Sequence, residues 1–138
     1  MIKKLIFIAV LLAAATGCKK DKADHLAKIE GIVGRWKVTE IEDSQNGKMI
    51  WQKAHSAGFI SFRTDGTVVD NNENLICCAP DMLTIDGVTI KLPPATGPTS
   101  PSCSSIKCAG CSNWEIEQHG DEIIITMCNS PRIKYARD

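Results

Sequence analysis

The sequence predicts an all-β fold, in which about eight short antiparallel strands follow one another up and down and one short helix precedes them. Two turn signals carry this prediction: Asp65-Gly66 and Asp86-Gly87 each lie between two apolar runs, and Asp-Gly in that position is a strong hairpin signal. Only one segment shows helical periodicity. Because consecutive hairpins must bury their apolar faces against one another, we expect a closed barrel or a sandwich.

The single helix is expected over residues 25–30, with Asp24 as its N-cap and Gly31 as its terminator. Alternating apolar residues between turn signals then predict the strands. A long segment, residues 93–112, contains four prolines and three cysteines and is expected to be a loop. The predicted strands are residues 33–41, 48–53, 59–62, 67–70, 82–85, 88–92, 114–118, 122–128 and 132–135.

The N-terminus has the three parts of an export signal. Lys3 and Lys4 precede an apolar run that is too short to span a bilayer, and this run ends at Ala15-Thr16-Gly17-Cys18. Those four residues resemble the lipobox of bacterial lipoproteins. The resemblance implies a signal peptide over residues 1–17, diacylation of Cys18, and a lipidated tether with the short helix over residues 18–31. Anchoring in the cell envelope of a bacterium follows. Lys19 is not acidic, which favours the outer membrane over the inner membrane and leaves the periplasmic and the surface face as alternatives.

The charge balance excludes one class of partner. The chain has 16 Lys and Arg residues against 16 Asp and Glu residues, so no basic surplus indicates a nucleic acid. His25, His55 and His119 are dispersed, and no catalytic or phosphate-loop motif is present, so we expect no enzyme, no metal and no cofactor. Glu115 and Glu117 alternate with apolar residues, which favours a solvated strand face over a catalytic pair.

Gly34-Arg35-Trp36 follows the predicted helix and resembles the Gly-x-Trp signature of lipocalin-like barrels. Residues 59–68 also resemble the strand, Asp-Gly turn and strand of short bacterial lipocalin-like lipoproteins. The resemblance covers residues 32–138 and implies an up-and-down β-barrel. It further implies that Gly34, Trp36 and an arginine close one end, with Arg137 the first candidate and Arg132 the second.

A barrel this short favours an interior filled by its own side chains, although an eight-stranded barrel can also hold one small ligand. The residues that would contact a small apolar ligand are aromatic, and packing in the core is the alternative for each of them. These candidate ligand-binding residues are Trp51, Phe59, Phe62, Trp114 and Tyr135.

Six cysteines remain after Cys18, and in an exported chain an even number predicts up to three disulfides. Cys77 and Cys78 are neighbours, so we expect them to take different partners. The loop 93–112 would then be linked to the segment around Cys77 and to the strand that ends at Cys128. The alternatives are a redox dithiol or half of a metal site at Cys108 and Cys111. The disulfide candidates are Cys77, Cys78, Cys103, Cys108, Cys111 and Cys128.

Three functions are therefore open. The preferred hypothesis is a membrane-anchored lipocalin-like lipoprotein that binds a small apolar ligand or serves an envelope role. The first alternative is an interaction module that recognises an envelope protein through the loop 93–112. The second alternative is metal binding or redox chemistry through Cys108 and Cys111.

Overall fold

The structure is a computed structural model that describes residues 18–138 apart from 109 and 129. Within these residues one α-helix, α2 (Cys18–Ile32), precedes a single sheet. A 3-10 helix, η1 (Pro101–Ser105), lies in the long loop. The strands are β1 (Gly34–Gln45), β2 (Lys48–Lys53), β3 (Phe59–Phe62), β4 (Val68–Val69), β5 (Met82–Ile85), β6 (Val88–Lys91), β7 (Asn113–His119), β8 (Glu122–Met127) and β9 (Ile133–Arg137).

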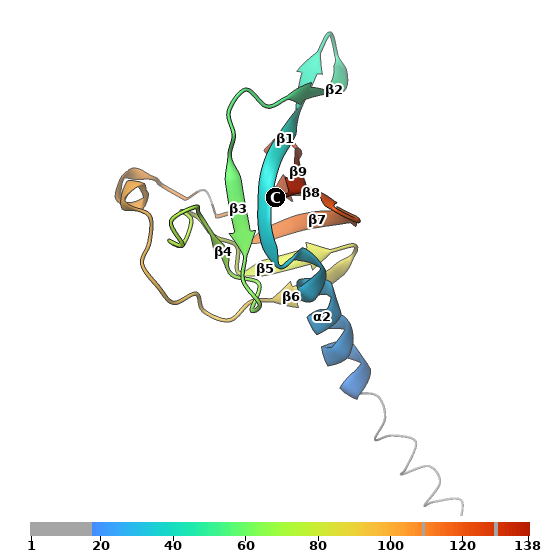
Figure 1. The fold of residues 1–138 in the computed structure, drawn as a ribbon, viewed down its shortest axis with the longest axis vertical. Helices are drawn as coiled ribbons and strands as arrows, with labels where there is room; N and C mark the ends of the chain where they lie inside the picture. Colours follow the sequence, from blue (N-terminus) through green and yellow to red (C-terminus); the bar gives the residue numbers. More distant parts are fainter. Residues whose placement is uncertain (1–17, 109, 129) are drawn as a thin grey trace, which may run out of the picture.

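The strands form one strongly curled sheet, a half-barrel with the order β4-β3-β1-β9-β8-β7-β5-β6, and β2 pairs with the far half of β1 (Figure 1). The all-β prediction is confirmed at this level. The up-and-down order is not, because β5 and β7 pair in parallel, Met82 opposite Asn113 and Ile85 opposite Ile116. Strand β6 ends beside the start of β5, and the loop after β6 leads past β5 at this same end, so β7 starts on the other side of β5.

The helix is longer than the sequence predicted. It begins at Cys18, so the polar segment that was expected to be a tether is helical. Seven of its 15 residues are Lys, Ala or Leu, which are good helix formers, and Asp24 and Lys28 are spaced for an i,i+4 ion pair. The polar composition of this segment does not exclude a helix, because a helix can carry polar side chains. No helix in the described part of the chain is long and apolar enough to cross a membrane.

Strand β1 also continues beyond its predicted end, to Gln45, because only Asn46 and Gly47 form the turn. Both residues have positive φ, 51° and 75°, as a tight hairpin of this type requires. The hairpin of β1 and β2 projects from the body at the end of the molecule away from α2 (Figure 1). A β-bulge between Val38 and Glu40 separates the half of β1 that pairs with β3 from the half that pairs with β2.

The concave face of the sheet is filled by apolar side chains. Ile29 and Ile32 from α2 pack among residues of nearly every strand, including Trp36, Phe62, Leu83, Ile116, Ile125 and Tyr135. The edge strands β4 and β6 do not pair with each other. The side chain of Leu92, just after β6, lies against Gly66, just before β4, where a Cβ would come within 2.6 Å of Leu92 Cδ2. Side-chain packing therefore occupies the gap that backbone pairing leaves open.

Candidate functional site

A pocket of about 350 Å³ lies where the disulfide-linked segments meet the start of β7 and the end of β8. The described residues that line it are Cys77, Cys78, Cys111, Trp114, Met127, Cys128 and Ser130. Trp114 and Met127 are opposite each other on β7 and β8, so both side chains project to the same face of the sheet. Trp114 belongs to the core, with 4% of its surface exposed, and forms the apolar floor of the pocket.

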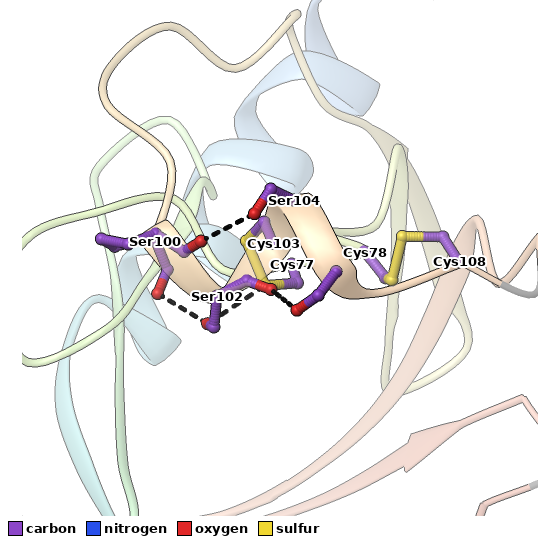
Figure 2. Close-up of a disulfide and its surroundings, with 9 residues drawn as sticks. Cys77, Cys78, Ser100, Ser102, Cys103, Ser104 and Cys108 are labelled. Atoms are coloured by element: carbon purple, nitrogen blue, oxygen red, sulfur yellow. Dashed lines mark hydrogen bonds between the residues drawn. A yellow bond between two sulfur atoms is a disulfide. The ribbon is translucent and has the colours of Figure 1, made fainter.

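The six cysteines form three disulfides: Cys77–Cys103, Cys78–Cys108 and Cys111–Cys128. Figure 2 shows the first two side by side, where adjacent residues of one segment bind two places on the loop. Serines in and just before η1 lie beside the first of these disulfides. Ser102 Oγ lies 3.8 Å from Cys77 Sγ and 3.0 Å from Ser100 Oγ, and Ser104 Oγ donates to the carbonyl of Pro101.

The prediction that Cys77 and Cys78 take different partners is confirmed, as is the link from the loop to Cys128. Cys108 and Cys111 are each bonded to a distant cysteine, so in this structure they form neither a dithiol pair nor a pair of free metal ligands. No cluster of three or more His, Cys, Asp or Glu residues suited to a metal ion exists among the described residues.

Backbone bonds also fix the loop. Leu75 N–H donates to the carbonyl of Pro98, and Ser100 N–H donates to the carbonyl of Leu75. Leu75 in turn bridges to Val69, the last residue of β4, so the loop continues the sheet at its edge. The walls of the pocket are therefore held by covalent and hydrogen bonds.

The five aromatic candidates for ligand contact do not share one site. Phe62, Trp114 and Tyr135 are buried in the core, with at most 4% of their surface exposed, and only Trp114 lines the pocket. Trp51 and Phe59 lie on the opposite face of the sheet. Phe59 is opposite Lys37 and packs under Arg35, whose Cζ is 4.2 Å from the ring centroid.

Trp51 lies among charged residues on that outer face. Lys134 Nζ is 4.6 Å and Arg132 Cζ is 5.4 Å from its ring centroid. Arg132 also pairs with Glu42 and Glu117, and Lys134 pairs with Glu40. Glu117 is thus part of a surface ion network. Trp51 therefore lies in a charged surface, apart from the aromatic candidates in the core.

The contact expected between Trp36 and Arg137 is present. Arg137 Cζ lies 4.2 Å from the centroid of the Trp36 ring, and its Nη atoms donate to the carbonyls of Val33 and Gly31 at 2.9 Å. Gly34 has φ +117°, and a Cβ there would come within 3.2 Å of Arg137 Nη1. Glycine is therefore required both for the backbone conformation and for the approach of the guanidinium. Arg132, the second candidate for the contact with Trp36, lies beside Trp51 instead.

Sequence reasoning missed two pocket residues, Met127 and Ser130. Met127 could have been found, since it continues the inward alternation of Ile123 and Ile125 to the end of β8. Ser130 lies in a turn after β8, and its sequence context contains no signal for the pocket. Thioether and disulfide sulfur atoms beside an indole make a polarisable apolar surface.

The predicted signal peptide, residues 1–17, and the first three residues of the predicted lipobox lie outside the described residues, and Cys18 is the first residue of α2. Comparisons of this chain with family models, with curated proteins and with solved structures found no match.

Proposed function

We propose that this protein is a lipid-anchored, lipocalin-like lipoprotein of the bacterial cell envelope that binds a small apolar ligand in the disulfide-lined pocket. The pocket of about 350 Å³ over Trp114 and Met127 carries the proposal, because small-molecule sites begin near 300 Å³ and are mostly apolar. The concave face of the sheet is filled by core side chains, so the ligand would occupy the end of the sheet and not its centre.

The extracytoplasmic location is supported by the three disulfides, which persist in oxidising compartments. The lipid anchor rests on the sequence around Cys18. It is tested by labelling cells with a radioactive fatty acid: the wild-type chain should carry the label and Cys18→Ala should not. Equal labelling of both chains would disprove anchoring at this residue.

Ligand binding is tested with N-phenyl-1-naphthylamine, a neutral dye that fluoresces in apolar sites. Met127→Gln should weaken binding about tenfold, because a polar amide replaces the thioether at the floor of the pocket. Met49→Gln is the matched control, since Met49 is 59% exposed on β2 and lies outside the pocket. If Met127→Gln binds the dye as well as wild type does, the pocket is not the binding site.

A second function, recognition of an envelope protein by the loop 93–112, is favoured by Ile106. This residue is 48% exposed just after η1, although it is large and apolar. A photo-crosslinking amino acid at position 106 should give a discrete adduct in cells, and the same group at Lys91 on β6 should not. Adducts of equal yield at both positions would indicate random collision.

A further inference from the structure

A second pocket, of about 360 Å³, lies beside the connection between β2 and β3, residues 54–58. Both strands pair with β1, Lys53 opposite Glu40 and Phe59 opposite Lys37. The bulge in β1 lies between these two pairs. The connection therefore lies beside the bulge in β1, and Figure 1 shows it as the segment that leads from β2 to β3.

Three basic side chains line this pocket, Lys37, Lys53 and His55. Among the described residues none of the three makes an ion pair, whereas all four arginines, at positions 35, 63, 132 and 137, pair with carboxylates. No Asp or Glu is among the lining residues. Glu40 is the cross-strand neighbour of Lys53, and its carboxylate is bonded to Lys134. The pocket thus combines three basic groups with no paired acid.

The backbone of the connection adds hydrogen-bond donors. Its ends are fixed, because Ala54 N–H donates to Thr39 and the carbonyl of Gly58 accepts from Val38 N–H. Between these ends, the amides of His55, Ser56 and Ala57 have no acceptor within the part of the chain that the structure describes. Consecutive backbone amides in a turn beside cationic side chains are a recurrent arrangement for anions.

We propose that this pocket binds a phosphate group. Lysine ammonium groups and an imidazole N–H supply charge-assisted or neutral donors, the free amides and the Ser56 hydroxyl supply further donors, and phosphate oxygens accept several bonds at once. The volume suits a phosphorylated small molecule or a phospholipid headgroup. This site is separate from the disulfide-lined pocket, and either proposal can fail alone.

Inorganic phosphate, titrated into the purified protein from which residues 1–17 have been removed, tests the site by isothermal calorimetry. Lys53→Gln with His55→Gln should weaken phosphate binding at least tenfold and leave the unfolding midpoint unchanged, because both side chains are exposed. Lys91→Gln is the control: it removes one exposed, unpaired lysine on β6 and should change affinity less than twofold. No heat of binding at millimolar phosphate, or an equal loss in the control, would overturn the proposal.

Vesicles distinguish the two sources of the phosphate. If vesicles of phosphatidylglycerol bind the protein and inorganic phosphate displaces them, the ligand is a lipid headgroup. If inorganic phosphate binds and the vesicles do not, the ligand is a soluble phosphorylated molecule. Vesicle binding that the double variant retains and that phosphate does not compete with would arise elsewhere and would contradict the proposal.

Discussion

At the scale of single residues, Arg137 joins three parts of the fold. Its guanidinium covers the ring of the fully buried Trp36 and binds the carbonyl of Gly31 at the end of α2 and that of Val33 before β1. The last carbonyls of a helix have no partner within the helix. Arg137 supplies one such partner from the opposite end of the chain.

Arg137→Gln should therefore lower the free energy of unfolding by roughly 2 to 3 kcal/mol, through loss of the stacking and the charge-assisted bonds. Arg35→Gln is the comparison. Arg35 stacks on the half-buried Phe59 and pairs with Asp138, so its loss should cost less than about 1 kcal/mol. Urea denaturation measures both values. Equal values for the two variants would mean that the carbonyl bonds of Arg137 contribute nothing.

Tyr135 gives a pH prediction that needs no substitution, because it is the only tyrosine in the chain. Burial raises its pKa from 10.0 to about 12. The stability contributed by the neutral phenol is complete below the unfolded pKa and is lost as the pH rises through the folded pKa. Ultraviolet titration of the phenolate should give a midpoint near 12 in the folded protein and about 10 in urea. A folded midpoint near 10 would place the hydroxyl in solvent.

At the scale of elements, the position of α2 depends on the turn between β5 and β6. Asp86 accepts from Lys28 Nζ on α2 at 2.8 Å and from the backbone N–H of Gln118 at 2.9 Å. The hydrogen bond from Lys28 has the larger effect on the pKa of Asp86, and together the two bonds lower it. Stability from a lowered pKa is present above the unfolded value and is lost as the pH falls through the folded value.

Asp86→Asn should cost roughly 1 kcal/mol at pH 7 and less at about pH 3, because the contribution of the carboxylate falls only as the pH drops below 3.8 toward the lowered pKa of the folded state. Asparagine tolerates the positive φ of this position, 45°, so the turn itself is retained. Urea denaturation at both pH values measures the effect. Lys28→Gln should give a similar loss, and the double variant should cost less than the sum. Strict additivity would show that the ion pair does not hold the helix.

The disulfides act on a second element, the loop 93–112. Cys111–Cys128 closes a 17-residue separation and Cys77–Cys103 one of 26 residues. Cys111→Ser with Cys128→Ser should lower the free energy of unfolding by about 3 kcal/mol and weaken binding of the dye, since both residues line the pocket. Denaturation and dye titration test this, and peptide mapping without reduction tests the pairing. A peptide that links Cys77 to Cys111 would contradict the structure.

At the scale of the whole molecule, features that depend on neighbouring residues could be predicted from the sequence, and the pairing of distant strands could not. The turn at Asp86-Gly87 and the position of three of the six cysteines in the loop 93–112 follow from neighbouring residues. The parallel pairing of β5 with β7 depends on where a 20-residue loop returns the chain, which no local pattern contains. The bulge after Val38 separates the Trp36 face from the Trp51 face, so Trp51 was assigned to a ligand site that it does not reach.

The two edges of the half-barrel, β4 and β6, share no backbone pairing, so side chains must hold them together. The side chain of Leu92 packs against Gly66, and the side chains of Ile29 and Leu83 also lie close to Gly66. Gly66 has φ +85° and Gly87 has φ +83°, but a Cβ on Gly87 would meet nothing within 4 Å. The two glycines therefore form a matched pair that differs in crowding alone.

Gly87→Ala should cost about 1 kcal/mol, which is the left-handed backbone strain of an ordinary residue. Gly66→Ala should cost roughly 2 to 4 kcal/mol, because overpacking against Leu92 adds to the same backbone strain. Shortening the neighbour in Gly66→Ala with Leu92→Ala should then destabilise the protein by less than the sum of the two single changes. Chemical denaturation of the four proteins gives these values. If the two glycine variants are equally stable, side chains do not join β4 to β6, and the sheet is open along that side.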